Sequence, residues 1–134
     1  MFSYIIGKHL FDMCLFYMII LHIGGDGMGS KKNTQELALK MIGFAGDAFS
    51  YYFQALDEAK KHNYAECDNM LKNGDDSLNQ AHELQTNLIT KEVNGEDTEY
   101  SILMVHAQDH LMNAVLAKKL VKELIDINKK LEKR

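Results

Sequence analysis

The sequence contains no proline and only two cysteines, Cys14 and Cys67, among its 134 residues. The absence of proline removes the strongest interruption of a helix, and the helix formers alanine, leucine, lysine and glutamate are plentiful. The two cysteines stand far apart and form no CxxC motif, which argues against a disulfide framework and favours a reducing, cytoplasmic compartment. We expect each cysteine to be a small buried or partly buried apolar residue.

Positive charge and long hydrophobic runs are also scarce. The formal net charge is −4, and no stripe of lysine and arginine interleaved with aromatic residues occurs, so no nucleic-acid partner is expected. The apolar stretch Leu10–Ile23 has 14 residues and contains Asp12, whereas a helix needs about 20 apolar residues to cross a bilayer. The length fits one domain, for which we expect no direct membrane insertion.

The first 30 residues differ in composition from the rest. They resemble a signal peptide weakly, with Lys8 as the charged region and a Gly-rich stretch in place of the usual cleavage site. The simpler interpretation is that Met28 is the physiological start and that an upstream extension has been translated. We therefore divide the chain into residues 1–30, a dispensable extension or misassigned start, and residues 31–134, the folded domain.

Three segments of this domain carry apolar residues at helical spacing, and the turns between them are short. Glu36 follows Asn33 by three residues, as in a capping box. Gly95 suits the left-handed conformation that follows a helix end. Three long helices joined by short turns predict an all-α fold, an antiparallel three-helix bundle. The predicted helices run from Asn33 to about His62, from Asn63 to at least Ile89 and from about Asp97 to about Lys130.

The third predicted helix has two adjacent apolar faces, a wider apolar band than one partner surface requires. We expect one face to pack within the chain and the other to pack against further copies of it. One face consists of Ile102, His106, Asp109, Asn113, Leu116, Leu120, Ile127 and Leu131, and its neighbour of Leu103, Ala107, His110, Leu111, Ala114, Ala117, Val121 and Leu124.

The most informative motif, Val105–Met112, lies in this helix. At roughly 100° per residue, His106 shares a face with Asp109 and His110, which follow it by three and four positions. Apolar residues flank the three polar side chains on both sides. A carboxylate in such surroundings is unfavourable unless it is paired, bound to a metal or at a wet interface. This cluster is therefore the candidate functional site.

Residue types alone leave open two interpretations in which the cluster carries out no reaction. A histidine inside a helix is most often a hydrogen-bonded core residue, although three polar side chains at one packed face need a dedicated network. His106, Asp109 and His110 are also metal-ligand types at spacings that occur in helical bundles. However, neither ExxH nor HExxH occurs, and one chain alone is short of ligands. Three chains around an axis, each contributing Asp109, would supply enough.

Phosphoryl transfer is the third reading of the cluster. A neutral imidazole is nucleophilic near neutral pH, provided that one ring nitrogen is unprotonated and that donors balance the charge of the phosphoryl group. His106 meets the first requirement. The sequence has no Gly-rich phosphate loop and no GKS or GKT, so a nucleotide kinase is not indicated and the phosphoryl group must come from another protein.

At these residues the sequence resembles the lactose/cellobiose-specific IIA components of the bacterial phosphoenolpyruvate-dependent sugar phosphotransferase system. The resemblance spans about Gln35 to Leu131. It rests on three stretches in combination, Gly43–Ala48, Asn79–Thr86 and Val105–Met112. It implies a phosphoryl carrier that serves the uptake of a lactose- or cellobiose-type disaccharide, and it leaves the sugar itself open. It does not explain the N-terminal extension.

The resemblance also implies roles for individual residues. His106 is the expected phosphoryl acceptor, which takes the group from the phosphohistidine of the carrier HPr and gives it to a cysteine of a sugar-specific IIB domain. Three subunits are expected to form a trimer, a nine-helix bundle, with Asp109 binding a divalent metal, magnesium, on the axis. Gln108 and His110 are expected to support or pack around His106, and His82 to hydrogen-bond near the site.

Two rival functions remain. One is a non-enzymatic helical interaction module, in which the cluster serves only to hold a structural metal on the trimer axis; it predicts metal-dependent assembly and no phosphohistidine. The other is a histidine phosphotransfer domain of two-component signalling. Those domains usually follow the histidine with a Lys-Gly-Ser-like stretch, whereas Ala107, Gln108 and Asp109 follow it here.

Overall fold

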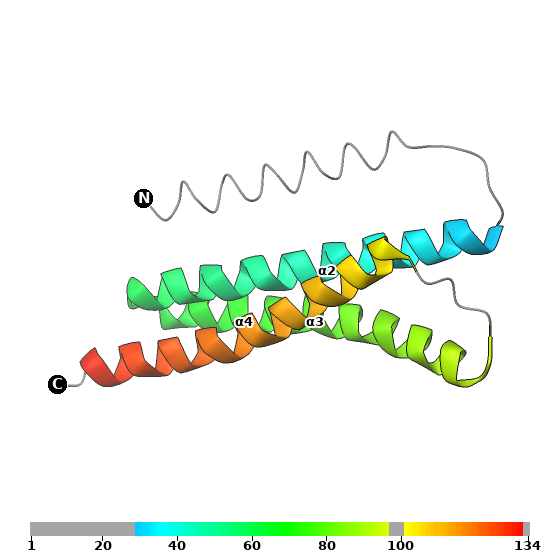
Figure 1. Cartoon of the computed structure of the whole chain (residues 1–134). Helices are drawn as coiled ribbons and strands as arrows, with labels where there is room; N and C mark the ends of the chain where they lie inside the picture. Colours follow the sequence, from blue (N-terminus) through cyan, green and yellow to red (C-terminus); the bar gives the residue numbers. More distant parts are fainter. Residues whose placement is uncertain (1–28, 97–100, 133–134) are drawn as a thin grey trace.

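Three long α-helices make up nearly all of the chain that the computed structural model describes, residues 29–96 and 101–132. They run alternately up and down in an antiparallel bundle (Figure 1). The predicted all-α, three-helix fold is confirmed. The predicted domain boundary at residue 30 depends on residues 1–28, outside the described range, and stays a prediction. The helices are α2 (Gly29–Lys60), α3 (Tyr64–Val93) and α4 (Ile102–Glu132).

Two predicted helix starts are wrong. Helix α2 begins at Gly29, so Asn33 lies inside it and is not its cap. Once a helix has formed, each further residue adds a hydrogen bond at little cost, and no proline stops the extension. Helix α4 begins at Ile102 and not near Asp97, because Ser101 is its cap. The Ser101 Oγ accepts a hydrogen bond from the Met104 amide at 3.2 Å, as an N-cap serine does.

Half of the buried core residues in the described part of the chain are alanines, which let the helices approach one another closely. The few large side chains that are fully buried, Tyr52, Met41 and Leu111 among them, fill the remaining space. Cys67 is buried and free, as expected, whereas Cys14 lies outside the described residues. Buried alanines line α2 and α4 at helical spacing: Ala38, Ala45, Ala48, Ala55, Ala59, Ala107, Ala114 and Ala117.

Gly74 allows α2 and α3 to approach at their middle. A Cβ atom at this position would lie 2.7 Å from Cε1 of Tyr52, closer than side chains tolerate. Helix α3 continues through Gly74 without a break. The glycine is therefore a contact point between helices. The Tyr52 ring that rests on it is fully buried.

A polar network beside Gly74 connects all three helices. The Tyr52 hydroxyl donates a hydrogen bond of 2.8 Å to Asp75 Oδ1. Lys118 of α4 lies 3.0 Å from the same carboxylate, and Lys122 lies 3.4 Å from its other oxygen. Burial raises the pKa of Asp75, but the hydrogen bonds from Lys118 and Tyr52 outweigh it and lower the pKa overall.

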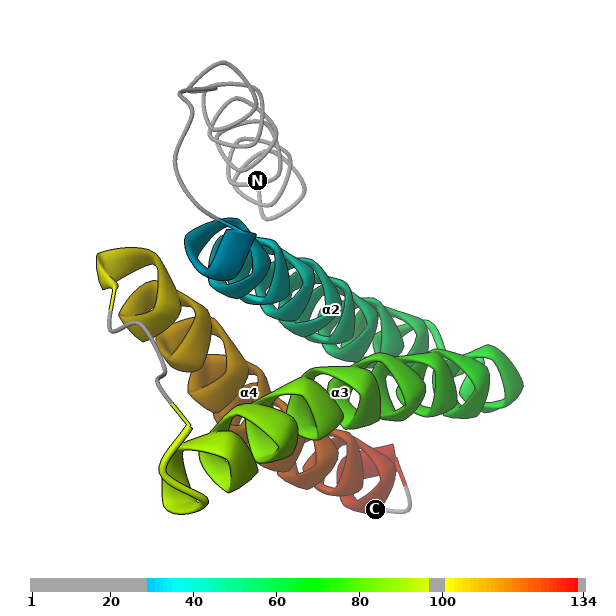
Figure 2. The same ribbon diagram turned by 90° about the vertical axis from the view of Figure 1, so that its right-hand side faces the viewer.

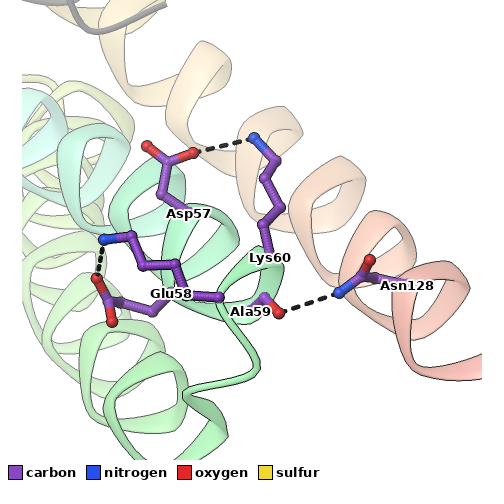
Figure 3. A network of polar contacts seen from close by, with 6 residues as sticks. Asp57, Glu58, Ala59, Lys60 and Asn128 are labelled. Carbon is purple, nitrogen blue, oxygen red and sulfur yellow. Dashed lines mark hydrogen bonds and ion pairs between the residues drawn. The ribbon is translucent and has the colours of Figure 1, made fainter. Parts of the chain in front are cut away.

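The turn between α2 and α3 is tied to the end of α4. Figure 3 shows Asn128 of α4 donating a hydrogen bond of 3.0 Å to the carbonyl oxygen of Ala59, one of the last carbonyls of α2. In the same view Lys60 pairs with Asp57 at 2.9 Å. The terminal carbonyls of a helix have no partner within it, so the Asn128 amide satisfies one of them.

A second set of contacts holds the last turn of α4 at the same place. His62 adopts a left-handed backbone conformation, with φ of 62°, and ends the run of helical residues. Its Nδ1 lies 2.6 Å from Glu132 Oε1, and the Tyr64 hydroxyl donates to the same oxygen. Lys129 lies over the Tyr64 ring, 5.0 Å from its centroid. These contacts fasten α4 to the α2–α3 turn at the end of the bundle.

Helix α2 packs along both α3 and α4, whereas α3 and α4 contact each other much less. Figure 2 shows the three helices nearly end-on, with α3 crossing over α4 at an angle. One side of α4 is therefore left without a partner in the subunit. No helix in the described part of the chain is long and apolar enough to span a membrane.

Candidate functional site

His106 and His110 form a contacting pair in the first half of α4. Their Nε2 atoms lie 3.1 Å apart, and the two rings stand nearly perpendicular, at 88°, with centroids 4.5 Å apart. Both side chains are partly buried. A hydrogen bond between the two imidazole nitrogens needs one N–H donor and one bare nitrogen, so one of the two Nε2 atoms carries a proton and the other does not. The shared face predicted from their spacing is confirmed.

The surroundings favour the neutral form of His110. Burial of the ring lowers its pKa, the nearby His106 lowers it further, and Asp109 opposes the shift. Burial acts in this direction because a charged imidazolium loses hydration in the protein. A neutral His110 ring has one nitrogen without a proton. Such a nitrogen can accept the hydrogen bond between the two rings.

Asp109 points away from the core. Its side chain is exposed on the outer side of α4. Within residues 29–96 and 101–132 of one chain, no three His, Cys, Asp or Glu side chains come together as metal ligands. A single subunit therefore does not form the predicted metal site. A carboxylate suits magnesium, and the remaining oxygen ligands would have to come from water or from further copies of Asp109.

The outer side of α4 also carries a row of exposed apolar side chains, which we call the outer stripe. Leu116 is 54% exposed and Leu120 is 55% exposed, although both lie in the middle of a long helix. Most of the neighbouring predicted face is buried or partly buried, but Leu124, which was predicted to lie on that face, is 47% exposed. Asp109 lies within the outer stripe, one turn from both Val105 and Met112. The stripe consists of Ile102, Val105, Met112, Leu116, Leu120, Leu124, Ile127 and Leu131.

Gln108 contacts α3. Its Oε1 accepts a hydrogen bond from Nε2 of Gln85, and both side chains are partly buried. This bond joins two helices that otherwise contact each other little. Sequence reasoning singled out Gln108 but missed Gln85. The only available signal was the position of Gln85 within Asn79–Thr86, one of the three stretches that carry the family resemblance.

His82 is the remaining residue that the sequence singled out. It lies on α3, one turn before Gln85, and its side chain is partly buried. The hydrogen bond from α3 to Gln108 of α4 comes from Gln85. A contact of His82 with the candidate site stays a prediction.

Comparison with known proteins identifies a family. Residues 36–129 match the model of the lactose/cellobiose-specific IIA subunit of the phosphotransferase system. The lactose-specific EIIA component of Staphylococcus aureus is 38% identical over 101 residues, which cover 75% of this chain and 98% of that protein. The matched region contains the whole of α3, α2 from residue 36 onward and α4 up to residue 129.

Solved structures show the same fold. The cellobiose-specific enzyme IIA of Bacillus anthracis is 41% identical and matches with a TM-score of 0.74. The match covers 81% of this chain and 96% of that one. A IIA(chitobiose)–HPr complex of the Escherichia coli phosphotransferase system is similar at 35% identity. Its TM-score is 0.65, over 74% of this chain and 96% of that one.

Proposed function

The chain belongs to the lactose/cellobiose-specific IIA family of the phosphotransferase system, and on this premise we propose that His106 is its phosphoryl acceptor. The phosphoryl group comes from the phosphohistidine of HPr and passes to the cysteine of a IIB domain, in the cytoplasm, during uptake of a lactose- or cellobiose-type disaccharide. The observation that carries the proposal is the His106–His110 pair, an imidazole nucleophile at the surface of α4 with a second imidazole 3.1 Å away. A IIA relative that forms a complex with HPr supports the choice of donor.

The chemistry is an in-line exchange between two imidazoles. A bare ring nitrogen of His106 forms a bond to phosphorus while the bond from phosphorus to the donor histidine breaks, and the electron pair leaves with the donor ring. Passage to a cysteine thiolate repeats the exchange with His106 as the leaving group. The transferred group carries about two negative charges, so hydrogen-bond donors near His106 stabilise it and carboxylates oppose it.

We propose that the subunits assemble through the outer stripe into a homotrimer, with Asp109 near its axis. A long row of exposed apolar side chains on one helix is typical of an interface and costly to leave in water. Three carboxylates that meet at an axis repel one another, and a bound divalent cation, magnesium, would offset that repulsion. The cation serves assembly in this proposal and takes no part in phosphoryl transfer.

The test is to incubate the protein with phosphoenolpyruvate, enzyme I and HPr, and to measure its intact mass and the position of any acid-labile phosphate. We expect one phosphoryl group per chain on His106. His106→Ala should accept none and keep its helicity. His62→Ala, in the turn between α2 and α3 beside the last turn of α4, is the matched control and should be labelled as wild type. Full labelling of His106→Ala would refute the assignment.

The exposed position of Asp109 within the outer stripe favours a second candidate function, a non-enzymatic interaction module whose trimer axis is held by metal. This alternative predicts assembly that depends on a divalent cation and no phosphohistidine under any donor system. A wild-type protein that remains unlabelled by a competent donor system, yet assembles only with metal, would select it.

A further inference from the structure

The sequence contains two Asn-Gly pairs, and the fold gives them opposite surroundings. Asn73 and Gly74 lie inside α3, whereas Asn94 and Gly95 directly follow its last residue, Val93. An Asn-Gly pair can react with itself, because glycine has no Cβ atom to hinder the approach of its backbone nitrogen to the asparagine side chain. The two pairs have the same local chemistry, so a difference in their reactivity has to come from the fold.

The interior of α3 holds Gly74 in place. Gly74 is buried, and a Cβ atom built on it would lie 2.7 Å from Cε1 of Tyr52, so the backbone has no room to move on that side. In a helix interior the amide N–H also donates to a carbonyl of the preceding turn. Freeing this nitrogen requires a 30-residue helix to open away from its ends, which is among the costly openings of a protein.

The turn after α3 leaves Gly95 open. Asn94 and Gly95 are both exposed, and among residues 29–96 and 101–132 nothing lies within 4 Å of a Cβ atom built on Gly95. Gly95 has φ of 75°, the left-handed conformation that follows a helix end. Its amide N–H donates a hydrogen bond of 3.0 Å to the carbonyl oxygen of Glu92, which is exposed too. Exposed hydrogen bonds at the end of a helix open at little cost, so the Gly95 nitrogen is readily freed.

We infer that Asn94 is a site of spontaneous covalent modification, in which the backbone nitrogen of Gly95 attacks the side-chain amide carbon of Asn94. The bond from Gly95 N to Asn94 Cγ forms as the Cγ–Nδ2 bond breaks, and Nδ2 leaves as ammonia with the proton of the Gly95 amide. Water then opens the cyclic succinimide at either of its carbonyl carbons. One opening gives aspartate, and the other gives isoaspartate, whose main chain runs through the former side-chain carbon. Water is the only co-reactant.

The modification adds charge at a place where the helix opposes it. Either product carries a new carboxylate at the C-terminal end of α3, near Glu92 and Glu96. The negative end of the helix dipole and these like charges both disfavour it. The end of α3 that leads toward α4 is therefore less stable in the modified chain. This reaction is separate from the proposed phosphoryl transfer and does not depend on it.

The first test compares the two asparagines within one protein. We would incubate the wild type in warm, mildly alkaline buffer, both folded and unfolded in urea, and locate the modified asparagines by peptide mapping and mass spectrometry. In the folded protein Asn94 should convert more than about tenfold faster than Asn73, because opening free energies rise steeply from helix ends to core helices. In urea the two rates should become similar, since both pairs then lie in an unfolded chain.

The second test counts isoaspartate directly, through methyl transfer from S-adenosylmethionine by an isoaspartyl methyltransferase. Folded wild type that has been incubated should accept methyl groups. Asn94→Gln should lose this acceptance, because the longer side chain closes a larger ring far more slowly. Asn73→Gln is the matched control and should accept as much as the wild type.

Three results would overturn the inference. A folded protein in which Asn73 converts as fast as Asn94 shows that the fold does not distinguish the two pairs. A folded protein that stays unmodified, while both asparagines convert in urea, shows that the turn holds Gly95 as firmly as the helix holds Gly74. Methyl acceptance that survives in Asn94→Gln places the isoaspartate at another residue.

Discussion

Replacing Gly74 with alanine tests how α2 and α3 pack. In an ordinary helix interior, alanine is more stable than glycine by about 1 kcal/mol. At Gly74 the added Cβ would lie 2.7 Å from Cε1 and 3.0 Å from Cδ1 of Tyr52. The Tyr52 ring is fully buried, so it has no free space to move into. We therefore expect Gly74→Ala to destabilise the protein despite its better helix propensity.

The magnitude follows from two costs. Forcing extra volume into a packed core costs about 1–3 kcal/mol. A displaced Tyr52 also loses its hydrogen bond to Asp75, and leaving such buried groups unpaired costs about 1–3 kcal/mol more. After the gain in helix propensity is subtracted, the free energy of unfolding should fall by about 1–5 kcal/mol. Gly43 provides the matched control, because nothing lies within 4 Å of a Cβ added there. Gly43→Ala should raise the free energy of unfolding by up to about 1 kcal/mol.

Urea unfolding of both variants and the wild type, at one protein concentration because assembly contributes to stability, gives the comparison. A Gly74→Ala protein that is as stable as the wild type would refute the packing argument. Tyr52→Leu removes the ring atoms that the new Cβ would meet. The double variant Gly74→Ala/Tyr52→Leu should accordingly be more stable than the sum of the two single effects predicts.

Two further predictions concern ionisable groups. The hydrogen bond from Tyr64 lowers the pKa of Glu132, burial opposes this shift, and the contact with His62 reinforces it. The ionised Glu132 side chain therefore stabilises the folded protein above its ordinary pKa of 4.5, and this stabilisation is lost as the pH falls through the lowered pKa. Urea unfolding from about pH 7 to about pH 3 gives the difference in unfolding free energy between the wild type and Glu132→Gln. This difference should shrink as the pH falls. A difference that stays constant would contradict the assigned contacts. Asp109→Leu should remain a folded trimer whose stability no longer changes with divalent metal, and monomers in sedimentation experiments with this variant would contradict the proposed axis.

The sequence predicts the helices well because their apolar periodicity survives over many turns. It predicts their ends poorly, because an end depends on single residues. Ser101 caps α4 through its hydroxyl group, whereas Asn33 has the residue type of a cap and lies inside α2. Gly74 shows the same limit. The residue type alone does not reveal its role, and only the tertiary fold shows that a Tyr52 ring occupies the space above the glycine.

In the candidate site too, contacts within one helix could be predicted from the sequence, whereas contacts between helices could not. His106 and His110 lie one turn apart, so their contact follows from helical geometry alone. Gln85 and Gln108 come from different helices on either side of a turn, and their contact depends on how α3 crosses α4. No local pattern contains that crossing. This explains why His82, a more conspicuous residue type, was singled out in Asn79–Thr86 while Gln85 was missed.

The position of Asp109 raises a question of energy, since a carboxylate within the outer stripe opposes assembly. The eight apolar side chains of the stripe are between 41% and 90% exposed. Burying a large apolar side chain fully is worth about 1.5–3 kcal/mol, so covering the exposed half of each gives about 6–12 kcal/mol per subunit. Removing one carboxylate from water costs several kcal/mol. The apolar contribution is the larger, so we expect the trimer to form at neutral pH even without metal, only less tightly. Asp109→Leu replaces a carboxylate that opposes assembly with an apolar side chain that favours it. The variant should form a tighter trimer than the wild type in metal-free buffer and differ little from it in the presence of magnesium.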